Sequence, residues 1–244
     1  MPGISLVAMI PARYAATRFP GKLMQLLGNK PVILHTYDST VATGLFDDVI
    51  VVTDSDIIYN EIISHGGKAI MSRKDHNSGS DRIAEAIENM DVNVVVNVQG
   101  DEPFQQKKPL QKLLAVFNDP AVQVASMMRK IKAKEINNPN NVKVVMDKNN
   151  DAVYFGRNIN QYSGKQETQF FLHIGVYAYR KEALLAFTKW PHSALEQSEK
   201  LEQLRYLENG VKIKMVETEY NNIAIDTPED LERARALLKL DNRE

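Results

Sequence analysis

Three cations stand close together in the loop that follows the first apolar run of the sequence. They are Arg13, Arg18 and Lys22, and no acidic residue precedes Asp38. Flexible cations on a loop that also offers backbone N–H groups suit a polyphosphate. The loop is neither a Walker A sequence nor a GxGxxG sequence, so it does not favour a P-loop or a dinucleotide site. The alternative is a solvated loop with incidental charges.

A carboxylate follows the valine-rich run at 94–98, which is the most convincing interior strand of the chain. This residue is Asp101, in the segment Val98-Gln99-Gly100-Asp101-Glu102-Pro103. An acid just past such a strand could help to hold Mg²⁺, which prefers one or two carboxylates plus substrate phosphates. The alternative is an ordinary turn, with Gly100 at an unusual φ and Asp101 bonded to the backbone.

A second carboxylate, Asp226, stands at the end of a short apolar run and just before a predicted helix. Thr227 suits the N-cap of that helix, Pro228 its first position and Asp230 its capping box. These local roles leave Asp226 unexplained. Two carboxylates from distant strands would give Mg²⁺ the site that neither Asp101 nor Asp226 gives alone.

Weaker candidates lie elsewhere in the chain. Ser78 or Ser80 can cap a helix, whose N-terminal amides could bind an anion or a base carbonyl, although a capped helix and nothing more is the alternative. His173 lies within an apolar strand pattern, where a histidine is more often a satisfied core residue. Glu196 belongs to a charge series on one helix, which is usually a solvated face.

The elements that must position these residues alternate between strands and helices. The first half of the chain shows apolar, β-branched runs at 4–10, 48–53 and 94–98, with helical patterns at about 31–43, 55–65 and 79–90. This alternation predicts an α/β fold with a mostly parallel sheet, helices on both faces and right-handed crossovers. Ligands of such sheets collect at the carboxyl ends of the strands, where the cationic loop and Asp101 are expected.

The pattern changes after about residue 120. Strands are predicted at 123–131, 142–147, 170–179 and 211–216, a hairpin turn at 148–153, and helices at 181–188, 195–208 and 228–240. Asn209-Gly210 is typical of the end of the second of these helices. We find no internal repeat and no linker, so we expect one domain, 1–244, with an inserted, protruding β-rich part at about 120–180.

Composition excludes several classes of protein. The 244 residues include 30 Lys and Arg, 31 Asp and Glu, and no Cys, with a net charge of −1. Disulfide scaffolds, thiolate nucleophiles and cysteine-ligated metal sites are therefore excluded. Near-neutrality disfavours a nucleic-acid partner. There is no signal-peptide pattern and no apolar run that could span a membrane, so we expect a cytoplasmic protein.

Taken together, the motifs resemble the 3-deoxy-manno-octulosonate cytidylyltransferases, or CMP-Kdo synthetases, over essentially the whole chain. The resemblance rests on the joint order and spacing of IPARYAATRFPGK (10–22), VVTD (51–54), DHNSGSDRIAE (75–85), VNVQGDEP (96–103), NPNNVKVVMD (138–147), HIGVYAYR (173–180), LEQSEKLEQLRYLENG (195–210) and IDTPEDLERAR (225–235).

The resemblance implies a nucleotide-diphosphosugar-transferase-like fold and a homodimer formed through the β-rich part. It implies that CTP and Kdo react, with Mg²⁺, to give CMP-Kdo and pyrophosphate for lipopolysaccharide biosynthesis. Within this reading Arg13, Arg18 and Lys22 would bind the triphosphate, and Asp101 and Asp226 would hold Mg²⁺. Whether a side chain acts as a general base stays open.

The resemblance also implies two sets of binding residues. The nucleotide side comprises Ala12, Arg13, Arg73, Ser78, Gly79, Ser80, Arg82 and Gln99. The sugar side comprises Gln99, Arg157, His173, Tyr177, Glu196 and Gln203.

The sequence departs from the family pattern at two places. Ser80 stands where the family often has Thr, and Ile-Pro is missing shortly after Arg157, so the loop at 157–161 can differ in shape. Close alternatives are an 8-amino-Kdo or an acylneuraminate cytidylyltransferase, although the latter usually has a Gly/Ser-rich first loop. A non-catalytic nucleotide-binding module on the same fold is the alternative from another class.

Overall fold

The computed structural model describes residues 3–15, 19–73, 76, 78–158, 169–220 and 223–241. The chain divides into two compact units. The first unit comprises Pro2–Lys107 and Asn221–Glu244, and the second unit comprises Lys108–Tyr220. The second unit contains all of the predicted β-rich part and extends beyond it at both ends.

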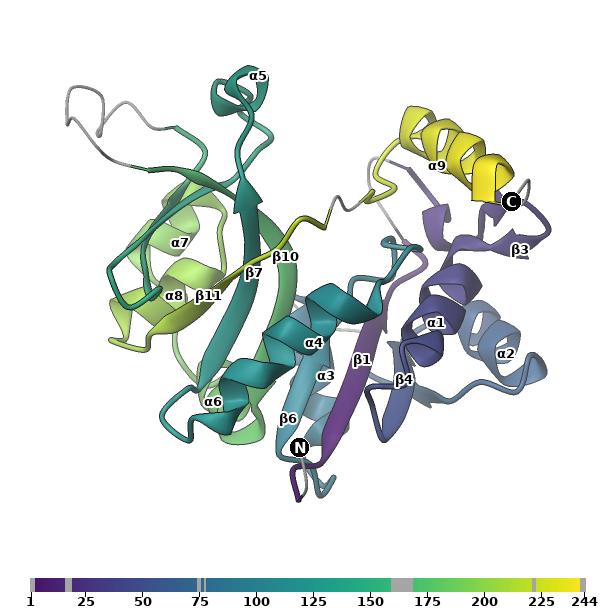
Figure 1. The fold of residues 1–244 in the computed structure, drawn as a ribbon. Coiled ribbons are helices and arrows are strands. Elements are labelled where there is room, and N and C mark those ends of the chain that lie inside the picture. The colour runs from purple at the N-terminus through teal and green to yellow at the C-terminus, as the bar shows by residue number, and fades with distance from the viewer. Residues whose placement is uncertain are drawn as a thin grey trace. The chain divides into compact units, whose positions relative to one another are not determined.

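A parallel sheet forms the centre of the first unit (Figure 1). Its described strands have the order β6-β1-β4-β5, and every pair among them is parallel. They are β1 (Leu6–Ala12), β4 (Asp48–Thr53), β5 (Ala69–Met71) and β6 (Val94–Asn97). The valines of β6 are fully buried. The predicted parallel α/β arrangement is therefore confirmed, with β1 starting two residues later than the pattern indicated.

Three described helices of the first unit contact this sheet: α1 (Val32–Ala42), α2 (Asp56–Ser64) and α3 (Gly79–Ile87). A further helix of this unit is α9 (Pro228–Asp241). Helices α1 and α3 contact both β1 and β4, whereas α2 contacts β4 and β5. A short 3₁₀ helix, η1 (Lys22–Met24), leads into a ribbon of β2 (Leu26–Leu27) and β3 (Lys30–Pro31), against which α9 packs.

The second unit is built on mixed strands. In it, β7 (Val124–Lys130) lies between β11 (Ile213–Glu217), which is parallel to it, and β10 (Phe171–Arg180), which is antiparallel. The antiparallel hairpin of β8 (Lys143–Met146) and β9 (Ala152–Gly156) joins through β8 to β10. Its helical segments are α4 (Lys107–Ala115), η2 (Val116–Asn118), α5 (Ala133–Ile136), α6 (Lys181–Phe187), α7 (Ala194–Glu199) and α8 (Gln203–Glu208).

The predicted hairpin between β8 and β9 is confirmed. Asn150 has a left-handed φ of 61°, a conformation that asparagine tolerates better than most residues. The Asp147 carboxylate accepts hydrogen bonds from the backbone N–H of Asn149 at 2.8 Å and of Asp151 at 2.9 Å. Local polar side chains thus define the turn, which is why the sequence signals it.

The prediction of one continuous helix over 195–208 is wrong. Helices α7 and α8 are separated at Lys200, which has a left-handed φ of 56°. On a continuous helix, Glu196 and Arg205 would lie on opposite faces and about 13 Å apart along the axis. The break instead brings Arg205 Nε to 2.7 Å from Glu196 Oε2. The predicted end is confirmed, because Asn209 caps α8 and Gly210 has a φ of 73°.

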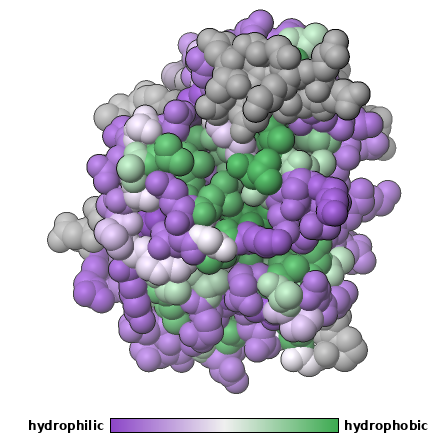
Figure 2. Space-filling view, turned by 90° about the vertical axis from the view of Figure 1, so that its left-hand side faces the viewer, coloured by the Kyte–Doolittle hydropathy of each residue, from purple (hydrophilic) through white to green (hydrophobic). Residues whose placement is uncertain are grey.

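Some apolar side chains of the second unit remain on the surface. Val153 of β9 is 55% exposed and Leu195 of α7 is 52% exposed. Figure 2 shows apolar side chains gathered between hydrophilic ones on the face that it presents. Among the described residues, no helix has the length and apolar character needed to cross a membrane.

Candidate active site

The loop after β1 turns back through a glycine. Gly21 has a left-handed φ of 64°, which glycine adopts without steric cost, and its N–H donates to the Tyr14 carbonyl at 3.3 Å. A side chain at this position would also meet the ring of Tyr14, whose Oη lies 3.6 Å from where a Cβ would stand. The turn sets the start of η1 and therefore the position of Lys22.

The structure brings Lys22 and both predicted metal ligands together. Lys22 Nζ contacts the Asp101 carboxylate and lies 3.0 Å from Asp226 Oδ1. The side chains of Lys22, Asp101 and Asp226 are 17%, 19% and 40% exposed, so the cluster is reachable from solvent. The backbone also ties the two acidic segments, because Ile225 N–H donates to the Asp101 carbonyl at 2.9 Å.

The charge of Lys22 is reinforced by this cluster. Burial alone lowers the pKa of its ammonium, but the charges and hydrogen bonds of Asp101 and Asp226 outweigh burial and raise that pKa above its ordinary value. Lys22 is therefore a cation throughout the neutral range. The two carboxylates direct their negative charge to the position of the Lys22 ammonium. Such a position can hold either an ammonium group or a divalent metal ion.

Position 100 is a glycine because neighbouring atoms leave little room for a side chain, and not because its φ is unusual. Gly100 is absent from the described residues with positive φ. A Cβ there would lie 3.2 Å from the Pro11 carbonyl oxygen and 3.2 Å from Ile33 Cδ1. The Gly100 carbonyl accepts from Thr36 Oγ1 at 2.8 Å. The alternative of a turn that needs a special φ is thus wrong, and the packing holds Asp101 beside the end of β1.

The predicted cap of α9 is confirmed, and the Asp226 carboxylate pairs with Lys22. Asp230 N–H donates to Thr227 Oγ1 at 3.3 Å, and Asp230 Oδ2 accepts from Thr227 N–H at 2.9 Å. The N–H of Asp226 donates to the same carboxylate at 3.1 Å. Local hydrogen bonds thus fix the Asp226 backbone, while its carboxylate is directed to Lys22.

The N-terminus of α3 also lies beside the end of β1. Ser78 is its N-cap, and its Oγ accepts from Asp81 N–H at 3.2 Å. A Cβ on Gly79 would lie 3.2 Å from Pro11 Cγ, so glycine allows this close approach. Ala12, at the end of β1, and Ser80 are buried. The structure therefore places Gly79 close to the end of β1, where Ala12 also lies, and nucleotide binding by these residues and Ser78 stays a prediction.

The other predicted nucleotide-side residues differ in how their polar groups are used. Arg82 is buried and donates to Asp54 Oδ2 at 2.9 Å and to Ser72 Oγ. Arg73 pairs through Nε with Glu85 at 2.9 Å, although its side chain is 80% exposed. Gln99 Nε2 donates to Asn97 Oδ1 at 2.9 Å. Arg82 thus has a structural role in the described chain, and nucleotide contacts by these side chains stay predictions.

The remaining loop cations are not both described. Arg13 follows β1 and is exposed, in the place expected for a phosphate ligand. Arg18 lies outside the described residues. Its predicted role therefore rests on the sequence alone.

On the sugar side, His173 and Tyr177 both lie on β10. His173 Nε2 is 3.0 Å from Ser126 Oγ, and its ring meets Phe155 edge-on with centroids 5.2 Å apart. Desolvation lowers the pKa of His173 to about 3, so the imidazole is neutral at physiological pH. Burial raises the pKa of Tyr177, so its phenol is neutral at physiological pH. A sugar contact by this buried hydroxyl stays a prediction.

Glu196 is fully engaged inside the second unit. Arg205 Nε lies 2.7 Å from its Oε2, which also accepts from Ser193 N–H at 3.1 Å. Its Oε1 contacts Arg205 Nη2 and lies 3.0 Å from His192 Nδ1. The side chain is 6% exposed. These contacts give Glu196 a structural role, and a sugar contact there stays a prediction, as does one at the buried Gln203.

Arg157 follows β9 and reaches a neighbouring turn. Its Nη1 donates to the Asn140 carbonyl at 2.9 Å and to the Pro139 carbonyl at 3.3 Å. The departure from the family pattern lies mostly at 159–161, outside the described residues. No motif of the sequence pointed to Lys143, which is completely buried and bonded to the Arg157 carbonyl. The available signal was a lysine inside the apolar strand run VKVVM.

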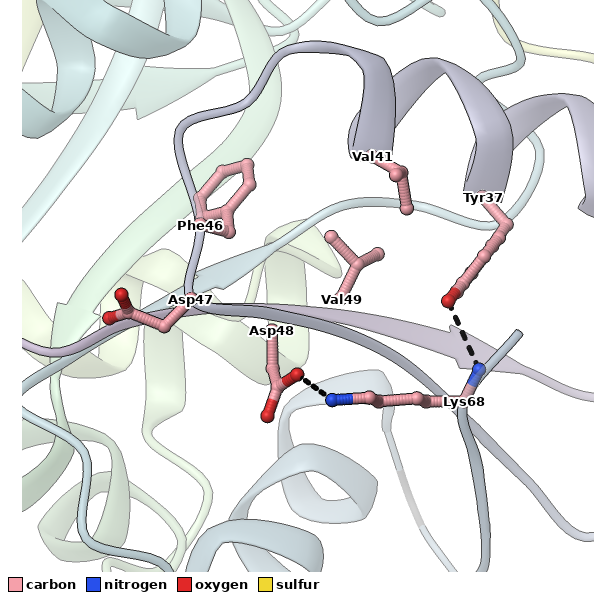
Figure 3. Close-up of a pocket in the computed structure, with 7 residues that line it drawn as sticks. All are labelled: Tyr37, Val41, Phe46, Asp47, Asp48, Val49 and Lys68. Atoms are coloured by element: carbon pink, nitrogen blue, oxygen red, sulfur yellow. Dashed lines mark hydrogen bonds and ion pairs between the residues drawn. The ribbon is translucent and has the colours of Figure 1, made fainter. Parts of the chain in front are cut away.

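A cavity of about 200 Å³ lies at the amino end of β4, the end opposite Thr53 (Figure 3). Its Lys68 Nζ is paired with Asp48, and the Lys68 N–H donates to Tyr37 Oη at 3.0 Å. The Asp47 carboxylate accepts from Leu6 N–H at 2.8 Å. The polar groups that line this cavity are thus used within the protein, and it contains none of the predicted site residues.

Comparison with known proteins identifies close relatives along nearly the whole chain. The sequence profile of the family described as Cytidylyltransferase matches residues 7–213. The chain is 61% identical to a 3-deoxy-manno-octulosonate cytidylyltransferase of Flavobacterium johnsoniae over 242 residues, which cover 97% of this chain and 99% of that relative. It is 54% identical to the protein of the same name from Christiangramia forsetii, over 96% of each chain.

A solved structure agrees with this. CMP:2-keto-3-deoxy-manno-octonic acid synthetase, complexed with CTP, superposes with a TM-score of 0.92 at 37% identity and covers 97% of this chain and 99% of its own. The likeness in sequence and in fold therefore extends through both units.

Proposed function

This chain belongs to the 3-deoxy-manno-octulosonate cytidylyltransferase family, and from this premise we propose that it transfers a cytidylyl group from CTP to Kdo, an acidic sugar. The products are CMP-Kdo and pyrophosphate. The observation that carries the proposal is the convergence of Lys22, Asp101 and Asp226 beside the end of β1. Support for the nucleotide comes from the related synthetase, whose structure contains CTP.

The reaction is a displacement at the α-phosphorus of CTP. The anomeric hydroxyl of the sugar forms the new O–P bond, and the bond to the pyrophosphate oxygen breaks. Both substrates are anionic, so the protein must offset their repulsion. Arg13, Arg18 and Lys22 are proposed to bind the triphosphate, and their charges would stabilise the negative charge that develops on pyrophosphate. Positioning then supplies much of the remaining rate enhancement.

Asp101 and Asp226 fit a Mg²⁺ site. Two carboxylates that both reach one ammonium nitrogen also reach one metal ion, and oxygen is the donor that Mg²⁺ prefers. Among the described residues no group of three or more acidic, histidine or cysteine side chains could hold a metal ion, so substrate phosphates would have to supply the remaining ligands. When bound, Mg²⁺ would neutralise phosphate charge and acidify the sugar hydroxyl. Lys22 would then pair with the substrate phosphates in place of the two carboxylates.

The nucleotide base is proposed to lie at the start of α3. Ser78, Gly79 and Ala12 surround the end of β1, and the backbone N–H groups at the start of a helix can meet a base carbonyl. Gln99 follows β6 near the same edge. These residues recognise the base mainly through backbone groups and short side chains.

The acidic sugar is proposed to meet the second unit. Arg157 supplies a cation for its carboxylate, and Tyr177 of β10 is a further proposed contact. The neutral imidazole of His173 supplies one nitrogen for hydrogen bonding. A bidentate guanidinium suits a carboxylate better than a lysine ammonium does.

A second copy of the chain is the proposed partner of the β-rich part. Val153 of this part is apolar and 55% exposed, and Leu195 of α7, elsewhere in the second unit, is 52% exposed. Exposed apolar side chains are typical of surfaces that bind another protein when they are contiguous. Light scattering on the purified protein tests this, and a monomer at micromolar concentration would contradict it.

We place the enzyme in the cytoplasm, where it would supply lipopolysaccharide biosynthesis.

The test is a pyrophosphate-release assay with CTP, Mg²⁺ and a panel of acidic sugars. We expect Kdo to give the highest kcat/KM, above 8-amino-Kdo and N-acetylneuraminate. A preference for either of the other sugars would reassign the substrate within the same chemistry. Tight CTP binding with no turnover on any sugar would instead identify a non-catalytic nucleotide-binding module.

A further inference from the structure

Lys143 is a charged residue in the interior of the second unit. It opens β8, where it pairs with Gly156 of β9 and Leu172 of β10, and its exposed fraction is 0%. Its ammonium donates to the Asn138 carbonyl at 2.8 Å and to the Arg157 carbonyl at 2.7 Å. Both partners are neutral backbone groups.

Burying a lysine ammonium in this way costs free energy, which would be unfavourable if the side chain served only to fill the interior. A buried ammonium without a carboxylate loses its hydration and recovers only part of it from carbonyl oxygens. Burial accordingly lowers the pKa of Lys143, and the charge of Arg157 lowers it further. A leucine or methionine would fill the same volume without this cost. We therefore look for the role of the ammonium in the two carbonyl groups to which it donates hydrogen bonds.

The two carbonyls belong to segments that Arg157 also connects. The Asn138 carbonyl begins a turn, because Asn141 N–H donates to it at 3.1 Å. The Arg157 guanidinium reaches the next two carbonyls of this turn, those of Pro139 at 3.3 Å and Asn140 at 2.9 Å. Lys143 therefore links the backbone of Arg157 to the Asn138 carbonyl of the turn. The Arg157 side chain makes a second link, to the Pro139 and Asn140 carbonyls of the same turn.

We propose that Lys143 is a positioning residue for Arg157: it fixes the backbone of Arg157 against the 138–141 turn, so that the guanidinium is aimed at the carboxylate of the acidic sugar. This rests on the proposed function, in which Arg157 binds that carboxylate. Two cations on one carbonyl network also repel each other, and an anion bound at Arg157 relieves that repulsion. The sugar carboxylate would thus take the place of the turn carbonyls on Arg157.

The second unit offers a matched control lysine. Lys214 of β11 donates to the Asn149 carbonyl at 2.7 Å and pairs with Asp151 at 2.6 Å. It therefore holds the closed end of the β8–β9 hairpin, whereas Lys143 holds the open end. Lys214→Met removes a lysine–carbonyl contact from the same hairpin without touching the 138–141 turn or Arg157.

The first measurement separates positioning from general stability. We expect Lys143→Met to raise KM for Kdo on the order of tenfold, with KM for CTP and kcat nearly unchanged, because a misplaced ligand weakens one substrate only. Lys214→Met should leave all three parameters unchanged. Equal losses in both variants would overturn the proposal. If Lys143→Met fails to fold, Lys143→Gln, whose shorter side chain has two N–H donors and no charge, should still raise KM for Kdo but by less, with Lys214→Gln as its control.

A double variant tests whether Lys143 acts through Arg157. If it does, Arg157→Ala alone and Arg157→Ala with Lys143→Met should have the same KM for Kdo, since no side chain remains to be aimed. Multiplied effects of the two changes would overturn the proposal.

Hydrogen–deuterium exchange on the free protein separates this inference from the proposed function. Lys143→Met should speed exchange in 138–142 and at 157–158, and Lys214→Met should do so only near 147–151. Unchanged exchange in Lys143→Met would overturn the anchoring itself, whatever the substrate. Faster exchange together with an unaltered KM for Kdo in Arg157→Ala would show that the anchor exists but that Arg157 does not bind the sugar, which would also overturn the proposal.

Discussion

Two charged clusters of this protein contain similar groups and differ in how those groups are satisfied. In the first unit, Lys22 holds Asp101 and Asp226, and the Asp226 side chain is 40% exposed. In the second unit, Glu196 and Arg205 are 6% and 3% exposed, and both carboxylate oxygens of Glu196 have several donors. The first cluster can exchange its partners for a ligand, whereas the second is already complete.

The difference also concerns where the residues come from. Lys22 and Asp226 are 204 positions apart, whereas Glu196 and Arg205 are nine apart. A local ion pair can be selected for the stability of one structural element. Bringing two carboxylates and a lysine together from three distant segments at a strand end is better explained by chemistry performed there.

The largest effect is expected for Asp101→Asn. Replacing a proposed metal ligand should lower the rate of pyrophosphate release by about 10²–10³-fold, because charge stabilisation at the phosphates is lost. The melting temperature should change little, since Lys22 keeps Asp226 as a partner. Asp119→Asn, on a turn of the second unit, is a suitable control. Turnover at the wild-type rate in Asp101→Asn would contradict a catalytic role for the Lys22–Asp101–Asp226 cluster.

Lys22→Met should act in two opposite directions. We expect kcat to fall by about tenfold to a hundredfold, because a cation at the leaving phosphates is lost. Mg²⁺ should bind the nucleotide-free protein more tightly, since the ammonium no longer competes for Asp101 and Asp226. Titration calorimetry with Mg²⁺ and the release assay measure the two effects. Weaker Mg²⁺ binding in the variant would contradict a shared site.

Glu196→Gln should reduce stability and not catalysis. Removing one partner of a buried ion pair leaves Arg205 uncompensated, and we expect a loss of about 3 kcal/mol in the free energy of unfolding. Glu199→Gln, on the exposed part of the same helix, should cost little. Urea unfolding measures both. If Glu196→Gln instead raised KM for Kdo at unchanged stability, the result would support Glu196 as a Kdo-binding residue.

The smallest effect concerns pH and His173. Its folded pKa of about 3 lies below the ordinary value of 6.5, so the unfolded chain binds its proton first as pH falls. Stability should therefore drop below pH 6.5, by at most about 1.4 kcal/mol per pH unit. Glu135, with a pKa of about 2, loses its contribution only below about pH 4.5.

The contribution of His173 can thus be measured between pH 6.5 and 5. We expect His173→Phe, which keeps an aromatic ring next to Phe155, to flatten the stability profile there. An unchanged slope in the variant would show that other groups set it. In the wild type, His173 should cause no titration of kcat between pH 6 and 9.

Local patterns in the sequence were sufficient for much of the fold. The strands of the first unit, the β8–β9 turn and the cap of α9 follow from side-chain periodicity, from asparagine and aspartate in the turn, and from Thr227 with Asp230. The helix over 195–208 was wrong because Lys200 is an ordinary helix residue by its propensity. Its left-handed conformation accompanies the contact between Glu196 and Arg205, which a continuous helix could not make, and no local pattern reports that contact.

The residue types that could do chemistry are visible in the sequence alone: the cationic loop with Lys22, an acid after β6 and an acid that the cap of α9 did not need. The contacts among Lys22, Asp101 and Asp226, the ion pair of Glu196 with Arg205 and the burial of Lys143 beside Arg157 become visible in the folded chain. The physical reason is that capping and periodicity depend on neighbours within a few residues. Contacts across tens or hundreds of residues depend on how strands and crossovers pack.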